Sequence, residues 1–324
     1  MELTRNKNLR MTLDFSVVVP CYNSTGSIKK LTAEFQSVFE KIEASYEIIL
    51  VNDYSSDAQT WKVIKDVAEN SGGKVLGVNL FRNFGQQAAT VCGFTFCKGK
   101  HVITIDDDMQ HNPQDLPKLL EKKDHDIVIG RLTNRKDGLF TQFTSSIKSY
   151  FDYVVLGKPK HVRLSSFRLL RGEVVREMIA IRTPSPFVPA LMFYVTKDCI
   201  NVDIEHNQRF EGNTNYSFKS RLKLFSLIVI NNSSFFLKII GYIGIFALIG
   251  SASLFAYFLV AKLFFTSPPT GWTSLFSAIL FFGGLTLFAV GLIGEYIIRI
   301  IPIVEMKRPF IVRELAGDEP QLSE

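Results

Sequence analysis

The sequence of 324 residues contains few cysteines, and their spacing suits neither a metal cluster nor a disulfide framework. Cys21, Cys92, Cys97 and Cys199 form no Cys-x-x-Cys pair and no Cys/His group with the spacing of a zinc site. Cysteines of this kind usually behave as small buried apolar residues, and disulfides are rare in reducing compartments. We therefore expect no disulfide and no structural zinc.

The chain also lacks internal repeats and low-complexity tracts. Residues 1–13 are polar and basic and contain no apolar stretch, so no signal peptide is expected. The net charge is +6, but no basic run with interleaved aromatic residues occurs in the first half of the chain. Lysines and arginines instead flank the long apolar segments that follow Phe235. This pattern favours the surface of a lipid bilayer as a partner and argues against nucleic acid.

Between Phe15 and Gly130, short apolar runs alternate with amphipathic stretches. This alternation predicts an α/β fold with a mostly parallel, Rossmann-like sheet and helices on both faces. The predicted strands are Phe15–Pro20, Tyr46–Asn52, Lys74–Asn79, His101–Asp106 and Asp126–Gly130, and the predicted helices are Ser27–Ala44, Asp57–Asn70 and Gly85–Cys97.

Three carboxylates, Asp106, Asp107 and Asp108, come directly after the apolar run that ends at Ile105. Carboxylates at the end of a buried strand lie where open α/β sheets bind ligands. Asp106 and Asp108 are two residues apart and can converge on one hard cation that also takes phosphate oxygens and water. We therefore predict a metal–diphosphate site. A solvated acidic turn is the alternative.

Two segments without charged residues, Ile239–Ala261 and Leu275–Gly294, are each long enough to cross the hydrocarbon core of a bilayer. Basic residues flank the pair on both sides, so the loop between the segments is expected on the outer side of the membrane. Tyr216–Asn232 mixes basic and apolar residues, which favours a helix in the membrane interface over an amphipathic helix packed on the soluble domain. The tail from Glu314 is polar and acidic and is expected to be disordered.

These patterns divide the chain into five parts. A polar tail (1–13) precedes the predicted α/β domain (14–215) and a juxtamembrane amphipathic helix (216–234). Two transmembrane helices follow within 235–301, at about 239–261 and 275–298, and a C-terminal tail covers 302–324.

Five sequence blocks in this order resemble the family 2 glycosyltransferases with the GT-A type fold, in the branch that acts on polyprenyl phosphates. They are Val17–Asn23, Asn52–Asp57, Arg82–Gln86, Asp106–Pro113 and Gly291–Arg299. The resemblance runs from Phe15 to about Arg313, and bactoprenol glucosyltransferases, undecaprenyl-phosphate formamido-arabinose transferases and dolichol-phosphate mannose synthases are the relatives it implies. Departures from the family pattern occur at Ser24, Asn52, Tyr54, Thr141, Val162 and Asn215.

The resemblance also implies roles for individual residues. Asp106 and Asp108 would be catalytic, and Asp108 with Gln110 would hold Mg²⁺ or Mn²⁺. The residues implied in nucleotide-sugar binding are Pro20, Tyr22, Asn23, Asp53, Asn83, Asp106 and Asp107. The residues implied near the lipid phosphate are Arg131, Arg135, Arg168 and Arg209.

The resemblance implies an inverting glycosyltransferase that moves a sugar from a nucleotide sugar, expected to be UDP-linked, to undecaprenyl or another polyprenyl phosphate. The product would serve cell-envelope glycan modification, such as lipopolysaccharide or O-antigen biosynthesis. The expected location is the bacterial inner membrane, with the catalytic domain and both termini in the cytoplasm, and the expected assembly is a homotetramer. Two alternatives remain: another lipid acceptor such as a diacylglycerol, and an inactive scaffold for flippase or polymerase partners.

Overall fold

The computed structural model describes residues 13–132, 157–159, 161–204, 253, 271–304 and 307–317, with some side chains of the last helix left out. The chain divides into two compact units, Met1–Tyr216 with Arg308–Glu324, and Ser217–Lys307. Several sequence predictions lie outside the described residues: Arg135, Thr141, Arg209, Asn215, the interface helix 216–234 and the first apolar segment except for residue 253.

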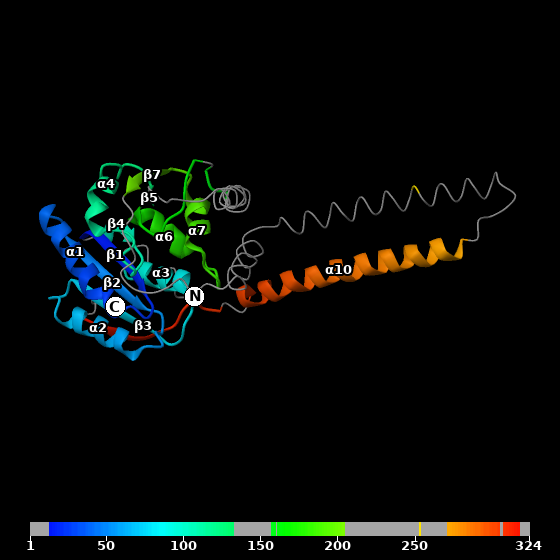
Figure 1. Ribbon diagram of the computed structural model, residues 1–324, viewed down its shortest axis with the longest axis horizontal. Helices are drawn as coiled ribbons and strands as arrows, with labels where there is room; N and C mark the ends of the chain where they lie inside the picture. The colour runs from blue at the N-terminus through cyan, green and yellow to red at the C-terminus, as the bar shows by residue number, and fades with distance from the viewer. Residues whose placement is uncertain are drawn as a thin grey trace. The chain divides into compact units, whose positions relative to one another are not determined.

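The first unit is an α/β domain whose elements alternate along the chain as predicted (Figure 1). In order, they are β1 (Leu13–Cys21), α1 (Ser27–Lys41), β2 (Tyr46–Asn52), α2 (Ala58–Glu69), β3 (Val75–Leu80), α3 (Gln86–Phe94), β4 (Gly99–Thr104), the 3₁₀ helix η2 (Pro113–Asp115), α4 (Leu116–Leu120), β5 (Ile127–Leu132), β6 (Arg168–Arg171), α6 (Gly172–Ala180), α7 (Val188–Val195), β7 (Cys199–Ile204) and β8 (Val312–Ala316).

The strands form one sheet in the order β7-β5-β6-β4-β1-β2-β3-β8. Strands β4, β1, β2 and β3 are parallel, as expected from their helical connections. Strand β6 runs antiparallel to both β4 and β5, and β8 runs antiparallel to β3. The sheet is therefore mixed, and β6, β7 and β8 are additions that the sequence patterns did not predict.

The central strands are buried on both faces of the sheet because helices cover both faces. Alternate side chains of each strand point to opposite faces. Val17 and Val19 of β1 belong to a core cluster with Phe35 and Phe39 of α1. On the other face, Val18 meets α3 at Gly93, where a Cβ would lie only 2.3 Å from a Val18 methyl group. Figure 1 shows α1 and α2 on one side of the sheet and α3, α6 and α7 on the other.

The C-terminal segment returns to the first unit as strand β8, so the expectation of disorder from Glu314 onward is wrong for Glu314–Ala316. Backbone pairing joins Ala316 to Gly77 and Leu315 to Val78. Glu314 accepts a hydrogen bond from the Trp61 indole at 3.2 Å and pairs with Lys65 at 3.1 Å. Residues Glu314–Ala316 are ordered because their backbone completes the open edge of β3, which acidic composition alone does not reveal.

The described part of the second unit is helix α10, Trp272–Val304. It contains the second predicted apolar segment, and large aliphatic side chains such as Leu275, Ile279 and Ile293 are exposed along it. Within the described ranges, no helix meets the combined length and apolarity required of a membrane span.

Candidate active site

The carboxyl ends of three neighbouring parallel strands place the predicted site residues close together. The register pairs Cys21 of β1 with Asn52 of β2, and Val18 of β1 with Thr104 of β4. Tyr22, Asp53 and Asp106 therefore follow adjacent strands at one edge of the sheet. This edge is where α/β sheets of this type bind ligands.

Asp107 joins the loop after β4 to the loop after β1. Its carboxylate accepts a hydrogen bond from the Tyr22 backbone N–H at 3.0 Å and another from the Ser24 hydroxyl. Burial raises the pKa of Asp107 to about 6, although the bonds from Ser24 and Tyr22 oppose the shift, and the adjacent Asp106 and Asp108 charges add to it. Ser24, one of the departures from the family pattern, thus holds the acidic loop in place. Asp107 remains a predicted nucleotide contact, but one of its oxygens already binds the protein.

Asp106 lies between neutral hydrogen-bond partners and a buried arginine. The Gln86 amide donates to Asp106 Oδ1 at 2.5 Å. Burial raises the Asp106 pKa most, and the Asp108 charge raises it further, whereas Ser166, Arg168 and Gln86 oppose the shift. The sequence analysis assigned no role to Gln86 or Ser166, although Gln86 belongs to the Arg82–Gln86 block that carried part of the family resemblance.

Asp108 and Gln110 flank a backbone reversal at Met109, whose φ of 58° lies in the left-handed region. The Gln110 backbone N–H donates to Asp108 Oδ1 at 3.1 Å, so the Asp108 carboxylate holds the turn on which both predicted metal ligands lie. In the described part of the chain, no group of three His, Cys, Asp or Glu residues is arranged to hold a metal ion. One carboxylate and one amide oxygen instead suit a hard divalent cation that completes its shell with substrate phosphate oxygens and water.

Asp53 anchors the loop that leads into α3. Its two carboxylate oxygens accept hydrogen bonds from the backbone N–H groups of Phe84 at 2.7 Å and Gly85 at 2.8 Å. Asp53 is buried, and this burial raises its pKa while the two N–H groups oppose the rise. Gly85 has a φ of 91°, which a residue with a Cβ adopts only at a cost. Asp53 therefore orders the segment of the predicted nucleotide contact Asn83, which is itself exposed.

Asn23 fastens the loop after β1 to the turn after β2. Its backbone N–H donates to the Ser55 hydroxyl at 3.0 Å, and its side chain bonds Ser56 and the Asp57 N–H. Pro20, also predicted to contact the nucleotide, is buried within β1, whereas Tyr22 beside Asn23 is half-exposed. The predicted nucleotide-binding residues therefore include exposed side chains, such as Tyr22 and Asn83, and side chains that hold the loops in position, such as Asp53 and Asp107.

The two described arginines of the predicted acceptor site lie in different environments. Arg131, at the end of β5, forms two bonds to the Asp203 carboxylate, at 2.5 and 2.9 Å. Arg168, in β6 opposite Thr104, is buried, and its Nε has no hydrogen-bond partner among the described residues. Burial lowers the Arg168 pKa to about 10, while the nearby Asp106 charge opposes this effect. Arg168 therefore lies beside the acidic loop, and its role toward a lipid phosphate remains a prediction.

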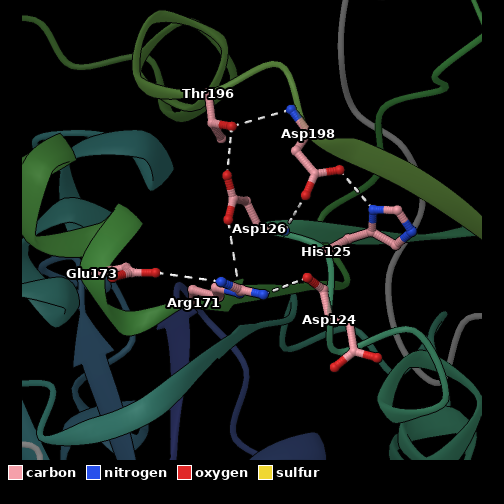
Figure 2. A network of polar contacts seen from close by, with 7 residues as sticks. All are labelled: Asp124, His125, Asp126, Arg171, Glu173, Thr196 and Asp198. Atoms are coloured by element: carbon pink, nitrogen blue, oxygen red, sulfur yellow. Dashed lines mark hydrogen bonds and ion pairs between the residues drawn. The ribbon is translucent and has the colours of Figure 1, made fainter.

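The amino end of the sheet carries a second group of charged residues, which is held by ion pairs (Figure 2). Arg171 donates to the backbone oxygen of Asp124, and its guanidinium lies 3.7 Å from Asp126 and 3.5 Å from Glu173. A cavity of about 310 Å³ opens beside this group and is lined by Lys100, His101, Lys123, Asp124, Arg171, Glu173 and Arg176.

Further bonds in Figure 2 connect the residues just before β5 to the residues just before β7. Asp198 pairs with His125 Nδ1 at 2.6 Å, and Thr196 donates to the second oxygen of Asp126 at 2.7 Å. Lys100 beside the cavity is also paired, with Asp14 at 3.1 Å. Because carboxylates pair with Lys100 and Arg171, and further hydrogen bonds join the neighbouring segments, we interpret this group as a structural corner of the domain, meaning a group that stabilises the fold.

Comparisons with known proteins indicate the family of the chain. The family model for glycosyl transferase family 2 matches residues 16–179. An undecaprenyl-phosphate 4-deoxy-4-formamido-L-arabinose transferase of Edwardsiella ictaluri is 30% identical over 317 residues, which cover 95% of this chain and 97% of that protein. The protein of the same name from Photorhabdus laumondii is 28% identical and covers 94% of each chain.

A solved structure resembles the fold at low sequence identity. Glucosyl-3-phosphoglycerate synthase from Mycobacterium tuberculosis, in complex with Mn²⁺, uridine diphosphate and phosphoglyceric acid, superposes with a TM-score of 0.50 at 14% identity. The match covers 68% of this chain and 78% of that one. The family model extends over β1 to β6 and most of α6, and therefore includes every strand end that forms the acidic site. The chain belongs to glycosyl transferase family 2.

Proposed function

We propose that the protein transfers a sugar from a nucleotide sugar, expected to be UDP-linked, to undecaprenyl phosphate or another polyprenyl phosphate. The observation that carries the proposal is the similarity to transferases named for undecaprenyl phosphate, which extends over 94–95% of the chain rather than over the catalytic domain alone. The product would be a lipid-linked sugar for modification of cell-envelope glycans.

The proposed reaction is a single displacement at the anomeric carbon. An oxygen of the lipid phosphate forms the new bond to that carbon, the bond from the carbon to the diphosphate breaks, and the nucleoside diphosphate leaves with the electron pair. The second pKa of a phosphate monoester is about 6, so the acceptor is largely a dianion at neutral pH and needs no strong base. The configuration at the anomeric carbon is inverted.

The donor side of the proposed site is formed by the loops after β1, β2 and β4. Asp108 and Gln110 would hold Mg²⁺ or Mn²⁺, which offsets the charge of the leaving diphosphate when it is bound. The neighbour from Mycobacterium tuberculosis binds Mn²⁺ together with uridine diphosphate. Asp106 would face the nucleoside end of the donor, where Gln86 fixes its orientation.

The acceptor side is proposed to include Arg131, Arg135, Arg168 and Arg209. A guanidinium group suits a phosphate because it donates two parallel charge-assisted hydrogen bonds. Arg131 is the described member that remains partly exposed, and it would exchange its bonds to Asp203 for bonds to phosphate. Arg168 is buried beside Asp106 and would act from within the domain.

We also propose that the second unit anchors the enzyme in the bacterial inner membrane as a two-helix hairpin, with the catalytic domain in the cytoplasm. Support comes from the uncharged sequence Leu275–Gly294 and from the exposed aliphatic side chains of α10. The first segment of this hairpin lies almost entirely outside the described residues. A homotetramer is the assembly that the family resemblance implies.

The function is tested with the purified full-length protein in detergent, undecaprenyl phosphate, Mn²⁺ and a panel of UDP- and GDP-linked sugars. We expect one nucleotide sugar to give a lipid product whose mass has increased by one sugar residue. Transfer to a diacylglycerol but not to undecaprenyl phosphate would support the alternative acceptor. A correctly folded protein that neither transfers nor hydrolyses any donor would support the scaffold alternative.

The membrane topology is tested by labelling introduced cysteines with an impermeant thiol reagent on intact cells. A cysteine at Thr270, in the predicted outer loop, should react. A cysteine at the exposed Lys62 of α2 should react only after the cells are permeabilised. Of the native cysteines, Cys21, Cys92 and Cys199 are buried and Cys97 is half-buried, so labelling of the protein without an introduced cysteine sets the background. The reverse labelling pattern would contradict the proposed orientation.

A further inference from the structure

Tyr54 lies in the turn after β2 with a backbone conformation that is unfavourable for tyrosine. Its φ is 54°, in the left-handed region where a Cβ clashes with the backbone and glycine is the usual residue. Its side chain is 48% exposed, so burial in the core does not offset this cost. In the part of the chain that the structure describes, its ring has no aromatic or cation partner.

The surrounding turn holds this conformation with hydrogen bonds. Asn52 is buried, and its side-chain oxygen accepts bonds from the Ser55 N–H at 3.2 Å and the Ser55 hydroxyl at 2.6 Å. The Asn52 amide donates to Asn79 of β3 at 2.8 Å. The strained residue is therefore the exposed centre of a rigid turn, and a strained residue on a rigid support is characteristic of functional sites.

A second exposed aromatic residue lies on the neighbouring loop. Tyr22 is 49% exposed and follows Cys21, whose strand partner is Asn52. The loop of Tyr22 is fastened to the turn of Tyr54 by the bond from the Asn23 N–H to Ser55. Two tyrosine rings are thus presented to solvent from two connected loops at the edge of the sheet that carries the acidic site.

We infer that Tyr54 provides a stacking surface for the base of the donor nucleotide. This inference rests on the proposed function, because it requires a nucleoside diphosphate at the acidic site. A tyrosine ring combines a flat apolar face with few rotatable bonds, and bases stack on such rings whatever their identity. Tyr54 therefore adds affinity for the nucleoside part of the donor, while the acidic loop and its metal bind the diphosphate.

The variant Tyr54→Gly separates this role from a structural one. Glycine adopts a φ of 54° without strain, so the ligand-free variant should unfold at a higher temperature than the wild type. Its affinity for uridine diphosphate, measured by calorimetry with Mn²⁺, should fall on the order of 10-fold, which is the contribution of one base–aromatic stack. Affinity for inorganic diphosphate, which has no base, should not change. Tyr54→Phe should bind uridine diphosphate like the wild type.

Glu43 offers a matched control because it is another exposed non-glycine residue in the left-handed region, with a φ of 51°, between α1 and β2. Glu43→Gly should also raise the unfolding temperature, but it should leave both affinities unchanged. Equal affinity of the wild type and Tyr54→Gly for uridine diphosphate would overturn the inference. So would an equal loss for inorganic diphosphate, because it would indicate a collapsed turn. A wild-type protein that binds inorganic diphosphate but no nucleoside diphosphate would overturn the proposed function and the inference together.

Discussion

The two ends of the sheet use carboxylates in opposite ways. At the amino end, Asp126 forms an ion pair with Arg171 and Asp198 forms a hydrogen bond with His125, and these contacts join neighbouring strands (Figure 2). At the carboxyl end, Asp106 and Asp107 accept hydrogen bonds from neutral groups and lie beside further carboxylates. Neighbouring negative charges in a buried site repel one another and lower the stability of the folded protein. A bound cation offsets this repulsion. This difference supports our interpretation of the amino end as a structural corner and of the carboxyl end as the proposed ligand site.

The backbone shows the same contrast. The described residues include four non-glycine residues with positive φ, and three of them, Asn23, Tyr54 and Met109, lie in loops at the carboxyl end. Each is adjacent to a residue predicted to bind the nucleotide or the metal. Strain of this kind persists only where surrounding contacts hold it, as the bonds around Asn23 and Ser55 do here. The strained loops therefore coincide with the proposed donor site.

The largest effect, on the transfer rate, is expected when one carboxylate at the carboxyl end of the sheet is replaced by an amide. The same replacement at the amino end serves as the comparison. Asp108→Asn should lower the transfer rate at least about 100-fold, because an amide replaces the charge that holds the cation, and losing such stabilisation costs about 3 kcal/mol. Its unfolding temperature should match the wild type. Asp126→Asn should keep the transfer rate and instead lose about 1 kcal/mol of stability from its contacts with Thr196 and Arg171.

Steady-state kinetics at saturating Mn²⁺ and thermal unfolding of both variants measure these effects. Near-normal turnover by Asp108→Asn would contradict the metal assignment. A loss of turnover in Asp126→Asn at unchanged stability would show that the amino end is not merely structural.

Asp53 is expected to affect stability and donor binding together. In Asp53→Asn, an amide NH₂ must face one of the backbone N–H groups of Phe84 and Gly85, so a buried donor loses its acceptor. The expected loss is about 1–3 kcal/mol in the free energy of unfolding, measured in urea. Weaker binding of uridine diphosphate should accompany it, because the Asn83 loop loses its anchor. Unchanged stability would mean that the loop is held by other contacts.

A smaller effect is expected where β8 docks on α2. Glu314→Ala removes the acceptor of the Trp61 indole and the partner of Lys65, and it should cost about 1 kcal/mol. Glu314→Gln keeps an acceptor for the indole, so it should cost less, since a partly exposed ion pair contributes little. Denaturant unfolding followed by tryptophan fluorescence compares the two variants. Equal losses would indicate that the charge, rather than the hydrogen bond, fixes the strand.

The smallest predicted effect concerns the pH dependence of stability at the amino end. Hydrogen bonds from Ser45 and the neighbouring Lys100 lower the pKa of Asp14 to about 2. A carboxyl group whose pKa is lower in the folded state stabilises the fold above its unfolded pKa, and this contribution disappears as the pH falls toward the folded value. Asp14→Asn should therefore lower the unfolding temperature slightly at pH 7, and the difference should shrink between about pH 4 and pH 2. A constant difference across this range would contradict the assignment.

The sequence by itself determined the first five strands and three helices, with ends that differ from the structure by no more than a few residues. Their signals are local: apolar runs with the period of a strand, and amphipathic stretches bounded by residues such as Asp57, which caps α2. The position of Asp106 to Asp108 after a buried strand also predicted that these carboxylates lie at the carboxyl end of the parallel strands, whereas their binding of a metal and a nucleotide stays a prediction. The family membership followed from motifs in the same order.

Only the tertiary structure decided which residues hold the site together. Strand β6 has an arginine at each end, and burial of Arg168 depends on pairing with β4, about 65 residues away in the chain. Strand β8 forms because it completes the edge of β3 from the far end of the sequence. Gln86 meets Asp106, and Ser24 meets Asp107, only when three strands align in register. Such contacts depend on distances between segments far apart in sequence, which composition and periodicity do not encode.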